Sequence, residues 1–282
     1  MNIGTLRNSG FEFTVSATPI RTQDFQWKID ANASTLKNEI VKLPSEPFFW
    51  SQSLCDYYFA EGNSLYDIYT CKTDGIDPQT GLVRYVKADG TITNIATEIS
   101  QADYQKVGST LPKFYGSITN TFNYRNFDLS FMFYYSLGAY MFDQQYWERT
   151  RVRHQTSPLS DLVESRWQQP GDVTSIPRFT ESYWGTYMTG HCDRYVFKND
   201  YLRLRNLTFG YTVPAQAVKK AGISNLRFYV SADNLLTFGA CVKRYAEPEG
   251  ALNGNNYNGN SETDSGLPGG RRIFMGGIQL TF

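Results

Sequence analysis

Histidine and cysteine are scarce in this chain, and long apolar runs are missing. The 282 residues include 2 His and 4 Cys, too few for a convincing metal cluster, and the cysteines do not show metal-ligand spacing. No apolar stretch approaches the roughly 20 residues of a membrane helix. Any contact with a membrane must therefore be made by strands, because only helices and closed barrels satisfy their backbone groups in lipid.

Charge is low and balanced. Lys+Arg and Asp+Glu number 27 each, so no basic field favours a nucleic-acid partner. Nucleophile-elbow, zinc-protease and phosphate-loop motifs are absent from the sequence, and His154 and His191 have no nucleophile or carboxylate at motif spacing. We therefore expect neither an enzyme nor a cofactor.

The cysteines and the first residues leave two alternatives open. A disulfide between Cys55 and Cys71 is compatible with an oxidising compartment, but isolated thiols, including Cys192 and Cys241, fit equally well. The N-terminus lacks the basic and apolar regions of a signal peptide. Read literally, this indicates a cytoplasmic protein; alternatively, the chain is the tail of a longer protein with its export signal upstream.

Aromatic residues are abundant, at 16%, and they alternate with polar ones. In segments Phe114–Tyr124 and Phe127–Leu137 the apolar residues share one parity and the polar residues the other. A period of two predicts strands, and residues 125–126 between them predict a tight reversal. Each run has about 11 residues, close to what a tilted strand needs to cross a bilayer, but the pattern fits a β-sandwich as well.

Similar alternation predicts about seven long strands in all. The other five are residues 11–17, 25–31, Tyr201–Thr212, 226–238 and 274–282. Within Tyr201–Thr212 the apolar residues change from even to odd positions. A bulge near Arg205 and Asn206 would keep the apolar residues of both halves on one face of the sheet.

Short and long connections alternate along the chain. The short ones are residues 18–24, 125–126 and 214–225, the last with a helical turn closed by Gly222; the long ones are 35–113, 138–199 and 239–270. All short turns then lie at one end of the sheet, as in outer-membrane barrels. The residues nearest that end on the apolar parity are all aromatic and would form a girdle: Phe25, Tyr124, Phe127, Tyr211, Phe228 and Phe282.

These features favour a transmembrane antiparallel barrel wall over a secreted β-sandwich that binds carbohydrate. A third alternative, a barrel enzyme, would require a Ser/His/Asp cluster. In the long loops we expect a helix from Ser157 and Pro158 to Trp167, stopped by Pro170, and turns around Asp74 and Asp77 in preference to a calcium loop. Four loop aromatics could stack on a ligand or pack on one another: Trp147, Tyr183, Trp184 and Tyr187.

Several stretches resemble the C-terminal part of the SusC/RagA family of TonB-dependent outer-membrane transporters. The most specific are NDYLRLRNLTFGYTVP at residues 199–214 and GISNLRFYVSADNLLTF at 222–238. NSGFE at 8–12, GIDPQTG at 75–81 and WQQPGD at 167–172 are similar to the family as well. Where the family usually has Asp-Pro-Glu, this chain has Ala246-Glu247-Pro248-Glu249.

The resemblance implies a transporter of large nutrients, commonly glycans or peptides, in the outer membrane. It implies a SusD-like surface lipoprotein and the TonB complex as partners. Seven strands cannot close the 22-stranded, plugged barrel of such transporters, so the whole chain, 1–282, is expected to be the C-terminal portion without the plug. Its last strand would carry the signal for the barrel-assembly machinery: Phe274, Ile278, Leu280 and Phe282. The substrate and the particular lipoprotein cannot be read from these residues.

Overall fold

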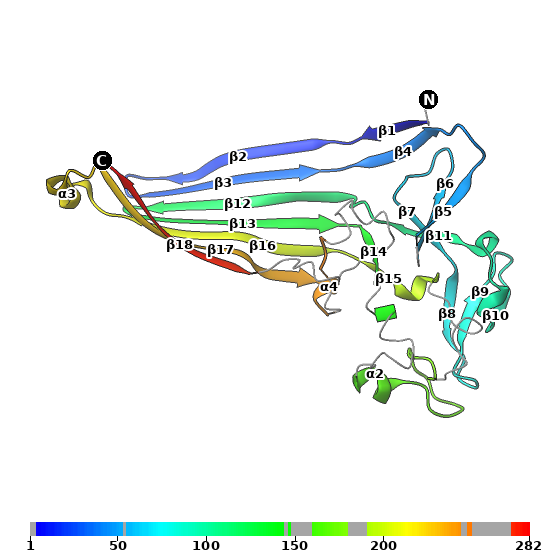
Figure 1. Ribbon diagram of the computed structural model, residues 1–282. Coiled ribbons are helices and arrows are strands. Elements are labelled where there is room, and N and C mark those ends of the chain that lie inside the picture. Colours follow the sequence, from blue (N-terminus) through cyan, green and yellow to red (C-terminus); the bar gives the residue numbers. More distant parts are fainter. Residues whose placement is uncertain are drawn as a thin grey trace.

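The computed structural model describes residues 4–52, 55–143, 146–147, 160–179, 191–243, 247–249 and 272–282. Long strands run side by side over most of its length, and smaller sheets gather at one end (Figure 1). The chain is all-β apart from short helical segments, as the alternation predicts.

The main element is a seven-stranded antiparallel sheet in the order β18-β17-β16-β13-β12-β3-β2. It contains the seven predicted long strands, and for three of them the bounds agree with the prediction. The strands are β2 (Glu12–Arg21), β3 (Phe25–Ser34), β12 (Phe114–Tyr124), β13 (Phe127–Leu137), β16 (Tyr201–Thr212), β17 (Asn225–Gly239) and β18 (Ile273–Thr281).

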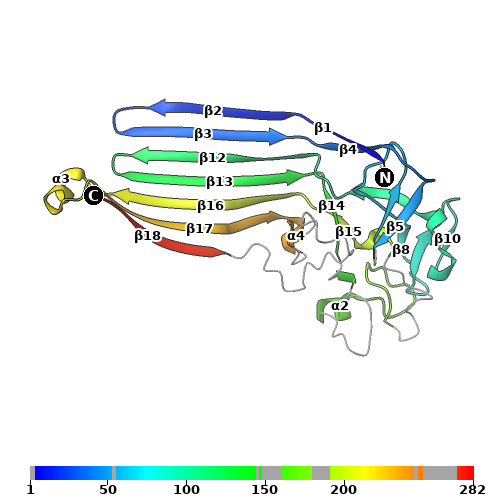
Figure 2. The same ribbon diagram turned by 45° about the horizontal axis from the view of Figure 1, so that its top comes forward.

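The short connections all lie at one end of this sheet, the short-turn end, as predicted (Figures 1 and 2). The β12–β13 pair begins at Tyr124 opposite Phe127, so only two residues reverse the chain, with Arg125 at φ +51°. Residues 214–225 form α3 (Ala215–Val218) and η5 (Lys219–Ala221), closed by left-handed Gly222. One expectation is corrected: residues 18–21 belong to β2, whose register shifts between Ala17 and Ile20.

A bulge lies where the parity slip of Tyr201–Thr212 predicts one. Met132 pairs with Asn206 while its neighbour Phe133 pairs with Leu204, so Arg205 is the extra residue. The register with β17 shifts at the same point. The bulge keeps Leu204 and Leu207 on the same face of the sheet although three positions separate them.

The sheet therefore has one apolar and one polar face. In the described residues no second sheet covers either face (Figure 2). On the apolar face Phe127 is 45% exposed, Ile118 41% and Val230 59%, whereas Phe131 and Phe133 are half-buried by their cross-strand neighbours. The arrangement that would have excluded a barrel wall, an opposing layer over Phe127, Phe131 and Phe133, does not occur among them.

At the opposite end, the long-loop end, the β1-β4 pair continues β2 and β3, and smaller sheets form a separate layer, the loop layer (Figures 1 and 2). In that layer one sheet has the order β11-β7-β6-β5, one has the order β10-β9-β8, and β14-β15 is a strand pair. The bounds are β1 (Thr5–Ser9), β4 (Lys37–Lys42), β5 (Phe48–Gln52), β6 (Cys55–Phe59), β7 (Asp67–Thr70), β8 (Lys72–Ile76), β9 (Val83–Val86), β10 (Ile92–Thr93), β11 (Gln105–Ser109), β14 (Tyr140–Phe142) and β15 (Val196–Lys198).

The helices of this layer are single turns or little more. They are η1 (Ala96–Glu98), η2 (Gln101–Asp103), α2 (Ser160–Ser165), η4 (Asp193–Tyr195) and α4 (Ala240–Lys243). The helix expected to reach Trp167 is shorter, because Arg166 leaves it to form an isolated bridge with Ile176. Its expected start, Ser157 and Pro158, lies outside the described residues. No described helix has the length and apolar character needed to cross a membrane.

Candidate functional site: a two-faced wall and its loop layer

The six predicted girdle residues lie along the short-turn end of the apolar face. Tyr124 pairs with both Phe25 and Phe127, Phe127 pairs with Tyr211, and Tyr211 pairs with Phe228. The Phe127 and Tyr211 rings lie 4.8 Å apart between centroids. Phe282 follows Thr281, the last paired residue of β18. The register thus brings five of these residues, from five strand ends, into one row at the sheet rim, and Phe282 lies beyond that row because Phe228 pairs with Ile278.

Asn120 is a polar residue on the apolar face, and its side chain is satisfied locally. Its Oδ1 accepts a hydrogen bond from Trp27 Nε1 at 3.1 Å. An unpaired amide in an apolar environment would cost several kcal/mol, roughly 2–7 depending on the reference state. The Trp27 bond removes part of that cost and keeps the face suited to hydrocarbon.

The polar face carries charges that pair with one another. Arg227 on β17 reaches across Gly210 to Asp128 on β13, with Nε–Oδ1 at 3.0 Å and Nη2–Oδ2 at 2.6 Å. A Cβ at Gly210 would collide with both partners, so the glycine leaves room for this bidentate pair. On the same face Lys28 pairs with Asp30 at 2.9 Å. The charges of these four residues are thus largely neutralised within the wall.

A segment from the loop after β17, residues 247–249, lies across the polar face near the long-loop end. Arg203 on β16 is nearly fully buried and binds Glu247 at 2.7 Å and Glu249 at 3.2 Å. Arg205 also binds Glu249, at 3.2 Å, and its guanidinium lies over the Tyr134 ring. We call residues 247–249 the strap. The two glutamates of the chain's variant Asp-Pro-Glu motif therefore attach this segment to the wall, together with a hydrogen bond from Asn199 Nδ2 to the carbonyl of Pro248 at 2.8 Å.

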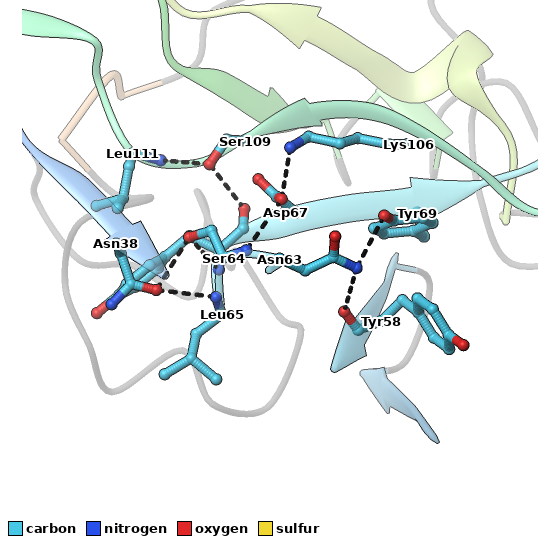
Figure 3. Close-up of polar contacts among 11 residues, drawn as sticks. Asn38, Tyr58, Asn63, Ser64, Leu65, Asp67, Tyr69, Lys106, Ser109 and Leu111 are labelled. Atoms are coloured by element: carbon cyan, nitrogen blue, oxygen red, sulfur yellow. Dashed lines mark hydrogen bonds and ion pairs between the residues drawn. The ribbon is translucent and has the colours of Figure 1, made fainter. Parts of the chain in front are cut away.

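A polar network attaches the loop layer to the continuation of the wall, as Figure 3 shows. Asn38 on β4 is 7% exposed and its Oδ1 accepts hydrogen bonds from Ser64 Oγ at 3.1 Å and Leu65 N at 3.0 Å. Asp67, also buried, forms an ion pair with Lys106 Nζ at 2.5 Å. These contacts join β4 and the 60–66 turn to β7 and β11, so they attach the loops to the strand ends.

The core of the loop layer is aromatic and contains two of the cysteines. Ile68, Tyr85, Phe142 and Tyr195 are buried around Cys71 and Cys192. Cys71 is a free thiol, so the Cys55–Cys71 disulfide left open by the sequence is not formed. Burial raises the pKa of both thiols, to about 12 for Cys192. A thiol that stays protonated is a poor nucleophile, so these cysteines act as core residues.

An aspartate–histidine pair crosses this layer. Asp56 is fully buried, and its Oδ2 lies 2.8 Å from Nδ1 of His191, whose ring stacks on Tyr104 at 6.1 Å. Burial raises the pKa of Tyr104. No sequence signal could have indicated this pair, because its members are 135 positions apart and share no motif.

Two of the segments that carry the family resemblance contact each other. Trp167 Nε1 donates to the carbonyl of Pro78 at 2.8 Å, and the Trp167 ring lies against Gly81. Asp77 accepts hydrogen bonds from Gln79 N at 2.9 Å and Thr80 Oγ1 at 2.7 Å. The GIDPQTG stretch is therefore a turn, as expected, and WQQPGD packs on it.

The predicted ligand-stacking aromatics have different outcomes. Trp147 is 5% exposed and belongs to the loop core, in keeping with the second of the two alternatives, packing against other loop residues. Tyr183, Trp184 and Tyr187 lie outside the described residues. Of the four residues expected to form the assembly signal, Phe274, Ile278 and Leu280 lie on the apolar face of β18, and Phe282 directly follows the strand. Phe274 is 69% exposed and Phe282 84%.

The sequence and the fold were compared with those of known proteins. No protein-family model matches the chain. TonB-dependent receptor P3 of Formosa agariphila is 30% identical over all of this chain and 29% of its own length. TonB-dependent receptor SusC of Bacteroides thetaiotaomicron is 28% identical over 75% of the chain and 21% of its own length.

Solved structures agree on the fold. A structure of the RagAB peptide transporter superposes with a TM-score of 0.77 at 20% identity, over 100% of this chain and 30% of that one. The chain belongs with the SusC/RagA-type TonB-dependent receptors. It spans less than a third of the length of the relatives and structures reported above. Its seven-stranded sheet corresponds to part of a much larger β structure.

Proposed function

We propose that this chain forms the C-terminal part of the wall and loops of a TonB-dependent outer-membrane transporter that imports large nutrients such as glycans or peptides. The observation that carries the proposal is the uncovered apolar face, bordered by an aromatic row at the short-turn end. A lipid-facing apolar band with aromatic girdles is the signature of outer-membrane barrels. The similarity to TonB-dependent receptors supports the same assignment.

The polar face would then line the lumen. Its charges are already paired, as in Asp128–Arg227 and Arg203–Glu247, which suits a wall packed against a plug or water. A surface lipoprotein similar to SusD would cover the loop layer, and the TonB complex would act through the rest of the protein. Ligand stacking by Tyr183, Trp184 and Tyr187, and assembly recognition of β18, belong to the same proposal.

Ile118 and Thr119 allow a matched test in the intact outer-membrane protein. They are neighbours at the middle of β12, but Ile118 is on the apolar face and Thr119 on the polar face. On a lipid face, arginine at the bilayer midplane costs about 2–4 kcal/mol, whereas lumen substitutions are tolerated. We expect Ile118→Arg to lower the folded fraction in lipid vesicles and Thr119→Arg to leave it nearly unchanged.

Folding in vesicles is read from the heat-dependent gel mobility of the barrel and from denaturant titration. A soluble sheet exposing Ile118 to water would tolerate arginine there as well as at Thr119. Equal folding of the two variants, or a monodisperse product without detergent, would therefore contradict the proposal.

A further inference from the structure

The three short turns carry an excess of positive charge. Residues 22–24, 125–126 and 213–224 contain three cations, Arg125, Lys219 and Lys220, against one anion, Asp24, while the whole chain has a net charge of zero. Their positions at one end of the sheet bring these cations to a single rim (Figures 1 and 2). The charge of this rim is a consequence of the topology, since the residues are distant in sequence.

Arg125 lies at the apolar side of this rim, and the two lysines belong to the turn beyond the ends of β16 and β17. The Arg125 guanidinium lies 5.6 Å from the centroid of the Tyr124 ring, which belongs to the apolar face. Its side chain is 62% exposed and pairs with Asp24 at 3.3 Å. Lys219 and Lys220 are exposed, and neither forms an ion pair with any residue that the structure describes.

The basic turn is attached firmly to the wall. Val218, directly before the two lysines, is buried, and Val213 N donates to Leu226 O at 2.8 Å. At the other end of the turn, Ser224 N donates to Thr281 O at 2.8 Å. The lysines are therefore presented from a fixed position beside the aromatic row, and not from a free tail.

We propose that this basic rim, with Lys219 and Lys220 at its centre, binds the headgroups of anionic phospholipids in the membrane leaflet at the short-turn end. The inference rests on the proposed function, which puts the aromatic row at the lipid interface. Aromatic rings occupy the headgroup level, and cations just beyond them meet the phosphates. Charge complementarity favours an anionic lipid over a zwitterionic one as the occupant.

The test uses the intact protein, purified in detergent and titrated with phosphatidylglycerol or phosphatidylcholine. Bound lipid is counted by native mass spectrometry. Each lysine near an anionic surface strengthens binding about fivefold, so Lys219→Gln with Lys220→Gln should weaken phosphatidylglycerol binding by at least about tenfold. Phosphatidylcholine binding should stay unchanged, and 0.5 M salt should remove most of the difference through screening.

A double variant at the opposite end is the control. Lys42→Gln with Lys72→Gln removes two exposed cations from the long-loop end and should leave phosphatidylglycerol binding as in the parent protein. Equal weakening by the two double variants would overturn the proposal, as would unchanged binding in the Lys219/Lys220 variant. In the second case the basic turn would face water or a protein partner.

Insertion into pure phosphatidylcholine vesicles separates this proposal from the function proposed above. Insertion of the parent protein without preference for phosphatidylglycerol would overturn the lipid site alone. Failure to insert into any vesicle would overturn the membrane wall and the lipid site together.

Discussion

The strap over Arg203 gives the sharpest prediction for stability. Arg203 has 2% of its side-chain surface exposed, and its charge is met by Glu247 at 2.7 Å and Glu249 at 3.2 Å. Thr237 Oγ1 accepts a further hydrogen bond from its Nε at 3.0 Å. Replacing both glutamates with glutamine keeps the shape of the strap but leaves a buried cation without a counter-charge.

Breaking a buried ion pair by removing one partner costs about 3–5 kcal/mol. At about 1.4 kcal/mol per factor of ten, Glu247→Gln with Glu249→Gln should raise local opening at the start of β16 by about 100-fold or more. Arg205 shares Glu249 but its side chain is 42% exposed. Arg205→Gln should therefore change stability by no more than about 1 kcal/mol.

Native-state hydrogen exchange measures this opening in the intact protein. The peptides that report it cover residues 201–205 and the end of β17, which carry the partners of Arg203. Adding Arg203→Met to the double glutamine variant removes the buried charge itself, so protection should return toward that of the parent protein.

Two results would refute the reasoning. Exchange of the double glutamine variant within about twofold of the parent would mean that solvent or another group already stabilises Arg203. Failure of Arg203→Met to restore protection would mean that the strap acts through shape and hydrogen bonding, not through charge.

Three smaller predictions follow from single positions. Gly81→Ala should destabilise the loop layer by about 1–3 kcal/mol more than Gly90→Ala, because both glycines have positive φ but only Gly81 lies against the Trp167 ring. Tryptophan fluorescence during denaturation measures this difference in stability, and equal destabilisation by the two substitutions would contradict the packing argument. Hydrogen bonds from the Thr80 hydroxyl and the Gln79 backbone N–H hold the pKa of Asp77 below its usual range. The ionised carboxylate of Asp77 therefore stabilises the turn above the unfolded pKa of about 3.9, and this stabilisation is lost as pH falls through the lower folded pKa. Amide protection of the turn should stay constant from pH 7 to about 5 and drop below about pH 4, and Asp77→Ala should lack this dependence. Gly210→Ala should break the ion pair across it and lower the unfolding temperature on heated gels, whereas Gly222→Ser, in a turn with open space, should cost only the left-handed strain, about 1–2 kcal/mol.

The strands, their faces and their turns could be predicted from the sequence because these features are local. A side-chain period of two assigns each residue to a face without knowledge of its partners. That is why Phe114–Tyr124 and Phe127–Leu137 are correct to the residue, and why the parity slip locates the bulge at Arg205. Residues 18–21 were misassigned because a bulge interrupts the alternation there.

The tertiary structure alone decided the contacts of the long loops. No period links Asp56 to His191 or Arg203 to Glu247, and burial of Trp147 depends on segments far from it in the chain. An aromatic residue in a loop has the same local sequence signature whether it faces a ligand or a core. Only the assembled packing separates these outcomes, since burial is a property of all the neighbours together and not of the residue.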